Sequence, residues 1–306
     1  MPGMKLSAIA IALAIGLATP LPAAKVQVGY CTSVKNFEAA KAAGFDYVEV
    51  SATEVANLSD ADFDAVLAKS KELGVPTPAA NLFVPATIKV VGPDVNVEQQ
   101  TAHVKKVMSR LSKMGVQVQV FGSGGARRVP DGFSKDEAWK QLVDFSRRAA
   151  EEAKAVGITV TIEPLRTQET NIINSAAEGL KLVEAVNHPN FQLMIDFYHL
   201  ASEKEDPAIV IKAKDHLRHL HVANPNGRVF PQKWEEFDYA PFFANLKTIG
   251  YDKRISMEGS TTDLARRVDA GGAGSAHSNA LRSSATVTGP CAARSVVEPS
   301  MLMRLS

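Results

Sequence analysis

The chain has 306 residues, of which 45% are hydrophobic and 22% charged, and its formal net charge at pH 7 is +1. These values are ordinary for a globular protein. A charge so close to zero provides no overall basic field, so we expect neither nucleic acid nor an anionic membrane surface as a partner. The two cysteines, Cys31 and Cys291, provide no disulfide framework and no zinc-finger spacing.

The first 24 residues have the pattern of a secretory signal peptide. Lys5 precedes an apolar run from Leu6 to Leu17, and small residues follow up to Ala24. A short basic start, an apolar stretch and a small-residue end are typical of such peptides, and the run is short for a membrane span. We therefore predict removal of residues 1–24, no membrane segment afterwards, and a periplasmic or secreted protein. A buried first helix and a cytoplasmic location are the alternatives.

From residue 25 on, short apolar runs alternate with helical patterns. Strands are predicted at 26–30, 46–51, 76–83, 116–122, 158–163, 191–196, 217–222 and 254–258. Helices are predicted at 35–43, 59–73, 97–114, 134–156, 174–186, 206–216 and 239–249. Ser59 has the character of an N-cap and Gly74 that of a helix stop. The glycine-rich stretch 122–127 is expected to be a loop.

Eight strands alternating with helices in roughly 240 residues predict a single (β/α)8 barrel, the TIM barrel, over residues 25–265. A doubly wound open sheet is the second choice. It would normally have a glycine-rich turn after its first strand, and the sequence at that point is YCTSVKNF.

Residues 266–306 break this pattern. They are rich in Ala, Ser, Gly and Arg without a sustained apolar period, so we predict a disordered, low-complexity tail. A barrel normally ends on an amphipathic helix, and Gly271-Gly272 interrupts the candidate for it. The tail is either a divergent end or a segment translated out of frame. Because a missing closing helix would leave apolar surface open, dependence on a partner subunit, and hence a homo-oligomer, stays open.

Four consecutive predicted strands end in residues of the kind that bind metals. Glu163 ends the fifth strand, Asp196 the sixth and Glu258 the eighth, and His221 lies near the end of the seventh. Active sites of TIM barrels form at the C-terminal strand ends, so these four side chains are expected to meet. Three carboxylates and one imidazole suit Mn²⁺, Co²⁺ or Mg²⁺ better than structural zinc. His219 points to the same side as His221, and His221, nearer the barrel mouth, is our choice.

Other residues are expected at the mouth without an assigned role. Glu49 and Ser51 lie at the end of the second predicted strand, and Asn81 lies near the end of the third. Phe83, Phe197 and Trp234 could form an apolar wall, although such residues are more often part of the packing.

The sequence resembles the xylose-isomerase-like barrel superfamily of sugar isomerases and epimerases, and within it the ketose 3-epimerases and hydroxypyruvate isomerases. The resemblance spans roughly residues 26–262 and is carried by Glu163-Pro164-Leu165 with Glu169, Asp196-Phe197-Tyr198-His199, His221 with Arg228, and Glu258. It implies that Glu163, Asp196, His221 and Glu258 hold one divalent metal ion. It also implies that Glu163 and Glu258 exchange protons with the substrate carbon.

The same resemblance implies three substrate-binding residues. Glu169 follows Glu163 by six positions, and His199 follows Asp196 by three, as in the family. Arg228 follows His221 by seven, which makes that loop one residue longer than the family pattern. All three are expected to contact sugar hydroxyls.

The implied chemistry is removal of a proton next to a carbonyl, through a metal-stabilised enediolate. Return of the proton from the opposite face inverts the carbon, and return to the neighbouring carbon interconverts aldose and ketose. We therefore predict a metal-dependent sugar epimerase or isomerase with a small sugar as its partner. An inosose or keto-sugar dehydratase or lyase uses the same first step, and a non-catalytic secreted sugar-binding protein is a more distant alternative. An apurinic endonuclease is disfavoured, because predicted strands two to four end without histidine.

Overall fold

The computed structural model describes residues 26–231 and 233–259 of the chain. The predicted signal peptide, the predicted tail and Cys291 therefore lie outside the described residues. No helix within these ranges is long and apolar enough to cross a membrane.

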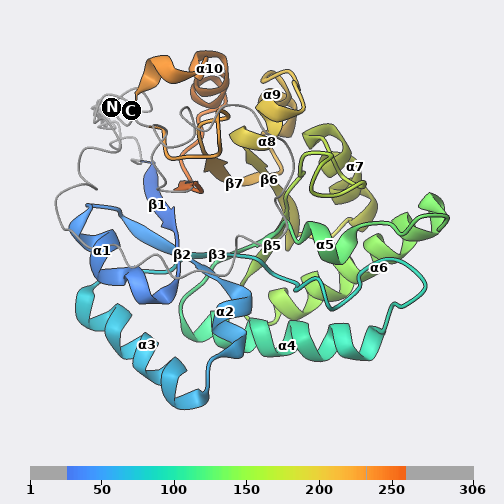
Figure 1. Ribbon diagram of the computed structural model, residues 1–306, viewed down its shortest axis with the longest axis horizontal. Coiled ribbons are helices and arrows are strands. Elements are labelled where there is room, and N and C mark those ends of the chain that lie inside the picture. Colours follow the sequence, from blue (N-terminus) through green and yellow to red (C-terminus); the bar gives the residue numbers. More distant parts are fainter. Residues whose placement is uncertain (1–25, 232, 260–306) are drawn as a thin grey trace, which may run out of the picture.

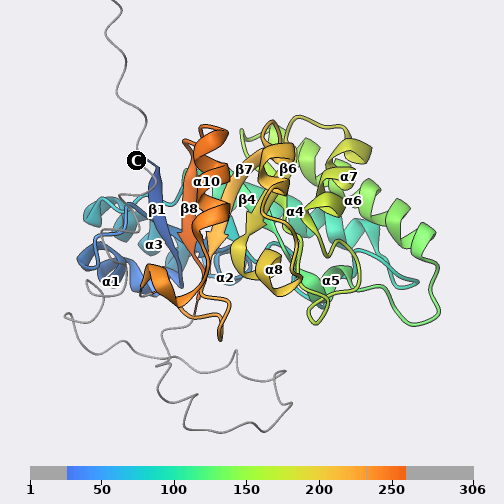
Figure 2. The ribbon, with the colours of Figure 1, turned by 90° about the horizontal axis from the view of Figure 1, so that it is seen from above.

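Eight parallel strands form one closed barrel in chain order, and the ring is completed by pairing between the last strand and the first. The strands are β1 (Gln27–Cys31), β2 (Tyr47–Ser51), β3 (Ala79–Asn81), β4 (Val118–Phe121), β5 (Thr159–Ile162), β6 (Phe191–Asp196), β7 (Leu217–Val222) and β8 (Arg254–Met257). Figure 2 shows β1 directly beside β8. The predicted TIM barrel is confirmed.

Helices surround the strands (Figure 1). Those expected from the sequence are α1 (Phe37–Ala42), α3 (Asp60–Leu73), α4 (Val97–Lys113), α6 (Lys135–Lys154), α7 (Ala176–Val186), α9 (Ile209–Ala213) and α10 (Ala240–Thr248). Their ends follow local chemistry. Ser59 Oγ accepts a hydrogen bond from the Asp62 amide at the start of α3, and Gly74 ends this helix with a φ of 63°. Both predictions about this helix are confirmed.

The helices bury apolar stripes against the barrel. In α4 the buried side chains include Val104, Val107, Met108 and Leu111. Their spacing of three and four residues places them on one face of the helix, which is the pattern expected for a helix that packs on a sheet. Apart from β1, in which Gln27 is exposed, the strands are almost entirely buried on both faces, which agrees with their nearly continuous apolar runs.

Short helical segments follow several strands and were not expected. They are η1 (Val34–Asn36), α2 (Ala52–Asn57), α5 (Gly124–Arg127), α8 (Phe197–Ser202) and η2 (Trp234–Glu236). Within the stretch 122–127, residues 124–127 form the one-turn helix α5, which corrects the expectation of a loop there. Helices α2, α5 and α8 lie at the same end of the barrel in Figure 2, the end at which their preceding strands finish.

Candidate active site

The four predicted metal ligands meet at the C-terminal end of the barrel. Glu163 directly follows β5, Asp196 is the last residue of β6, His221 lies in β7, and Glu258 directly follows β8. Each offers one ligand atom, and these four atoms lie within 4.8 Å of one another. The fold therefore brings together the residues that the sequence singled out.

Two buried carboxylate oxygens in this cluster have no hydrogen-bond partner among the described residues. They are Oε1 of Glu163 and Oδ2 of Asp196. His221 Nδ1 faces the same space, 3.6 Å from Glu163 Oε1 and 3.1 Å from Oε2 of Glu258. An unpartnered buried carboxylate oxygen is costly, and a divalent cation would satisfy both oxygens together with the imidazole nitrogen. The donor set thus fits a hard or intermediate divalent cation.

The environment of the three carboxyl groups shows the same need for positive charge. Burial raises the pKa of Asp196 to about 7 and also raises the pKa of Glu163. Burial acts in the same direction on Glu258, but the guanidinium of Arg228 and the imidazole of His221 outweigh it and lower that pKa to about 2. Without a cation, Asp196 and Glu163 hold protons more tightly than exposed carboxyls do.

The three residues expected to bind substrate lie beside this cluster. Arg228 donates a hydrogen bond from Nη1 to Glu169 Oε1 (3.3 Å) and another from Nη2 to Glu258 Oε2 (2.8 Å). His199 Nε2 lies 3.6 Å from Oδ2 of Asp196. The structure thus brings all seven predicted site residues together, and their individual roles stay predictions.

His199 has a defined protonation pattern. It lies on α8, one helical turn after Asp196, and its Nδ1 accepts a hydrogen bond from the backbone amide of Arg166 (3.2 Å). Nε2 therefore carries the proton of the neutral ring and points toward the cluster. Burial and the nearby charge of Arg228 lower the pKa of His199 to about 2, so the ring is a neutral hydrogen-bond donor at neutral pH.

A second arginine, not singled out from the sequence, supports the substrate-binding residues. Arg166 donates from Nε to Glu169 Oε1 (2.8 Å), so Glu169 is shared between Arg166 and Arg228. The two guanidinium carbons lie 5.1 and 4.8 Å from the ring centroid of Tyr198. These cation–π contacts fix the planes of both side chains.

Arg127 on α5 is a further buried residue that the sequence analysis did not identify. Its side chain donates to three backbone carbonyls, those of Gly122 (2.6 Å), Ile172 (2.8 Å) and Glu163 (2.6 Å). Among the described residues, no carboxylate forms an ion pair with it. Burial lowers its pKa to about 10, so it remains charged at neutral pH. Arg127 therefore fixes the backbone from which the Glu163 side chain extends.

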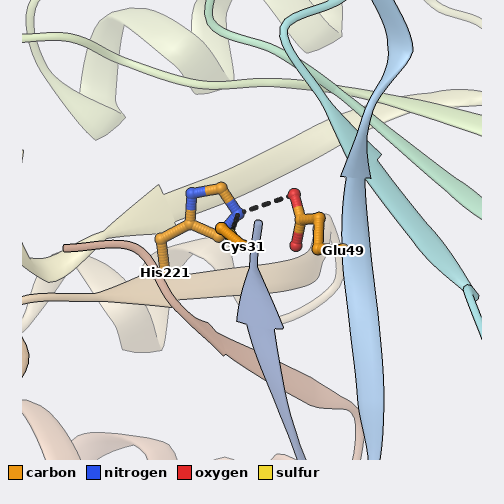
Figure 3. Close-up of side chains that lie close together, drawn as sticks. All are labelled: Cys31, Glu49 and His221. Atoms are coloured by element: carbon orange, nitrogen blue, oxygen red, sulfur yellow. Dashed lines mark hydrogen bonds and ion pairs between the residues drawn. The ribbon is translucent and has the colours of Figure 1, made fainter. Parts of the chain in front are cut away.

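Polar side chains continue from the cluster into the barrel interior. Glu49 on β2 is fully buried and lies 2.9 Å from His221 Nε2 and 2.7 Å from His219 Nε2. Figure 3 shows Glu49 and Cys31 facing the same edge of the His221 ring. The signal in the sequence was a carboxylate inside the apolar strand DYVEVS, opposite two histidines that share one face of another strand.

Of the aromatic residues proposed as an apolar wall, two belong to the packing. Phe83 is fully buried and contacts the rings of Phe121 and Phe145, with centroids 5.8 and 6.2 Å away. Phe197 is 2% exposed and packs against Phe242. Asn81, by contrast, reaches the cluster. Its Nδ2 donates to Oε1 of Glu258 (3.2 Å).

The fold and this cluster define a TIM-barrel protein with a candidate metal centre at the mouth. The chain belongs to the xylose isomerase-like TIM barrel family, whose model matches residues 37–280.

Similar proteins agree with this assignment. The chain is 28% identical over 225 residues to the D-psicose 3-epimerase of Ruminiclostridium cellulolyticum, covering 70% of this chain and 74% of that protein. It is 24% identical over 232 residues to the 3-dehydro-D-guloside 4-epimerase of Escherichia coli K12, covering 74% and 86%. The crystal structure of a D-allulose 3-epimerase from Methylomonas sp. matches with a TM-score of 0.70 and 26% identity, covering 78% and 86%. The chain is accordingly an enzyme of the sugar epimerase and isomerase class.

Proposed function

We propose that the chain is a divalent-metal-dependent ketose epimerase that moves the proton on a carbon next to the sugar carbonyl. The observation that carries the proposal is the pair of buried, unpartnered carboxylate oxygens on Glu163 and Asp196, facing His221 Nδ1. The similarity to enzymes named D-psicose 3-epimerase and L-ribulose 3-epimerase supports a free ketose as substrate.

Glu163, Asp196, His221 and Glu258 would hold the cation. When bound, it would supply positive charge beside the substrate oxygens and so stabilise the negative charge that develops as the proton leaves. Because four strands fix these side chains, the site is organised before the substrate arrives.

Glu163 and Glu258 would carry the proton. They extend from β5 and β8, and their ligand atoms lie within 4.8 Å of each other. A sugar carbon held between two carboxylates can lose its proton to one and regain a proton from the other on the opposite face, which inverts that carbon. The Arg228 guanidinium and the Asn81 amide both contact Glu258, so the direction of that carboxylate is fixed.

The remaining polar groups would orient the sugar. His199 presents an Nε2–H donor, Arg228 a guanidinium and Glu169 an acceptor, all on one side of the cluster. Sugar hydroxyl groups can both donate and accept hydrogen bonds. They can therefore accept from the His199 N–H and the Arg228 guanidinium and donate to the Glu169 carboxylate. Holding the sugar in one orientation lowers the barrier to proton transfer.

The test is proton exchange measured by NMR. D-fructose or D-tagatose is incubated with the protein in D₂O, with and without Mn²⁺. We expect Mn²⁺-dependent deuterium uptake at the carbon next to the carbonyl, and its loss in Glu258→Gln. Glu72→Gln is the matched control, because the Glu72 side chain is 70% exposed on α3. Absence of uptake by folded, Mn²⁺-bound protein would overturn the proposal, and loss of a hydroxyl from the sugar would identify a dehydratase instead.

A further inference from the structure

Glu49 lies outside the predicted ligand set, yet it contacts one of its members. Its Oε1 atom lies 2.9 Å from His221 Nε2, on the ring edge opposite the Nδ1 atom that faces the cluster. Its Oε2 atom lies 2.7 Å from His219 Nε2 and accepts a hydrogen bond from Ser256 Oγ at 2.5 Å. All four side chains are fully buried.

The hydrogen-bond pattern defines where the protons are. The other ring nitrogen of His219, Nδ1, is buried without a partner among the described residues. A proton on Nδ1 would be a buried N–H donor without an acceptor, which is energetically costly. The His219 proton therefore sits on Nε2 and points at Glu49. Tyr47 lies 2.8 Å from Ser256 Oγ and donates to it, which directs the Ser256 hydroxyl proton to Glu49.

Glu49 is therefore an ionised acceptor that receives donors from several sides. His219 and Ser256 share Oε2, and Oε1 is left for the N–H at His221 Nε2. This arrangement explains how a carboxylate with no exposed surface can remain charged. It also orients His221 so that its Nδ1 lone pair points at the metal cluster.

We propose that Glu49 is a positioning residue that fixes the tautomer and orientation of His221, so that Nδ1 is free to bind the metal. The inference rests on the proposed metal site. Carboxylates that accept the second N–H of a metal-binding histidine generally raise metal affinity, and in this chain the carboxylate comes from β2, on a different part of the ring from β5–β8, which carry the ligands.

Cys31 does not take over this role. Its Sγ lies 3.9 Å from His221 Nε2, whereas Glu49 Oε1 lies at 2.9 Å. Burial raises the pKa of the Cys31 thiol well above its ordinary value, so the sulfur stays protonated and is a weak acceptor. Glu49, Cys31 and His221 also offer ligand atoms within 4.8 Å of one another. However, hydrogen-bond donors already occupy both Glu49 oxygens.

The test is Glu49→Gln, which keeps the size of the side chain and changes its hydrogen bonding. A glutamine has one acceptor oxygen, which can accept from only one of the two imidazole N–H groups. Its NH₂ group is a donor and would face the N–H of the other imidazole, which is unfavourable. One histidine must then move its proton to Nδ1, and for His221 this blocks the metal-binding nitrogen. We expect Mn²⁺ affinity, measured by titration calorimetry, to fall by about 10- to 100-fold. In ¹⁵N NMR spectra of the metal-free protein, we expect the signal of the His221 Nε2–H to be lost or reduced, because the proton moves to Nδ1.

The control is Glu54→Gln. Glu54 is a partly buried glutamate on α2 that is hydrogen-bonded to Ser33 and does not contact the cluster. It should bind Mn²⁺ like the wild type. If Glu49→Gln folds and binds Mn²⁺ with unchanged affinity, or if His221 keeps its Nε2–H signal, Glu49 is only part of the packing and the proposal is overturned.

A second variant covers the case in which Glu49→Gln does not fold. Ser256→Ala removes one donor from Oε2 while it keeps the carboxylate, so we expect a smaller, few-fold fall in Mn²⁺ affinity. Unchanged affinity in that variant would also overturn the proposal. Failure of the proposed metal site looks different, because wild-type protein would then bind no Mn²⁺ at all. Failure of the proposed reaction alone would leave Mn²⁺ binding by the wild type intact and would show only in the deuterium-exchange test.

Discussion

Asp196 Oδ2 lies 3.6 Å from Arg228 Nη2, close enough for charge attraction but beyond hydrogen-bond distance. The other oxygen, Oδ1, accepts a hydrogen bond from the backbone amide of Tyr198 at 2.9 Å and caps α8. In Asp196, therefore, Oδ1 caps the helix, and Oδ2 remains available to bind a ligand.

This division predicts opposite effects of Asp196→Asn on stability and metal binding. The asparagine oxygen can still accept the hydrogen bond from the Tyr198 amide that caps α8. The substitution removes a buried carboxyl group that is ionised above about pH 7. We expect the metal-free variant to be more stable than the wild type at about pH 8, by up to about 4 kcal/mol for a pKa raised to about 7. The rise in Tm caused by Mn²⁺ should be lost. Thermal denaturation with and without Mn²⁺ checks both expectations. A metal-free variant that is less stable than the metal-free wild type would contradict the expected gain in stability.

The pH dependence of metal binding follows from the same carboxyls. The folded pKa values of Asp196 and Glu163 are raised above their unfolded values, so the metal-free folded state binds more protons than the unfolded chain between about pH 4 and pH 7. The stability that these protons contribute is present below that window and is lost as pH rises through it. A cation competes with the same protons. We therefore expect the Tm increase caused by Mn²⁺ to grow from about pH 5 to about pH 8; an increase that is independent of pH would argue against the assigned ligands.

Arg228→Lys tests recognition of the substrate. A lysine keeps the positive charge but cannot reach Glu169 and Glu258 at once with a planar fork. We expect kcat/KM for a ketose to fall by roughly 10- to 100-fold, while Mn²⁺ affinity changes much less. Arg147→Lys, at a side chain that is 52% exposed on α6, is the control and should leave the kinetics unchanged. An unchanged kcat/KM in Arg228→Lys would remove this residue from the substrate site.

Arg127→Lys tests the support beneath Glu163. A lysine cannot reproduce three directed bonds to the carbonyls of Gly122, Ile172 and Glu163. Two unsatisfied buried carbonyls should lower the free energy of unfolding by about 2–4 kcal/mol. Its neighbour Arg128 is exposed and donates to one carbonyl, so Arg128→Lys should change stability little. Denaturant unfolding compares the two, and equal stability would show that the buried guanidinium is dispensable.

The barrel and the meeting of the four proposed ligands could be predicted because both follow regular patterns in the sequence. Each strand is an apolar run, and in a parallel barrel every strand delivers its last side chains to one end. A carboxylate or histidine at four successive strand ends therefore predicts a cluster without knowledge of any contact. The two-residue period of a strand places His219 and His221 on the same side, and the choice of His221 followed from its position nearer the C-terminal end of the strand.

What could not be predicted depends on contacts between distant segments. Helices α5 and α8 have four and six residues, too few for a helical period to show. Arg127 looked like a loop residue because its burial depends on Ile172, which lies 45 positions away. The role of Glu49 was hidden for the same reason, since its partner His221 lies 172 positions further along the chain.

Closure of the ring between β1 and β8 also affects how the site is assembled during folding. The proposed metal ligands come from the last four strands, but the carboxylate proposed to orient one of them comes from β2, which β1 links to β8 across the closure of the ring. A fragment of either half would lack part of the site. Metal affinity is therefore a direct readout of whether the two halves of the chain have docked, and a Mn²⁺ signal that appears late in refolding would time that docking.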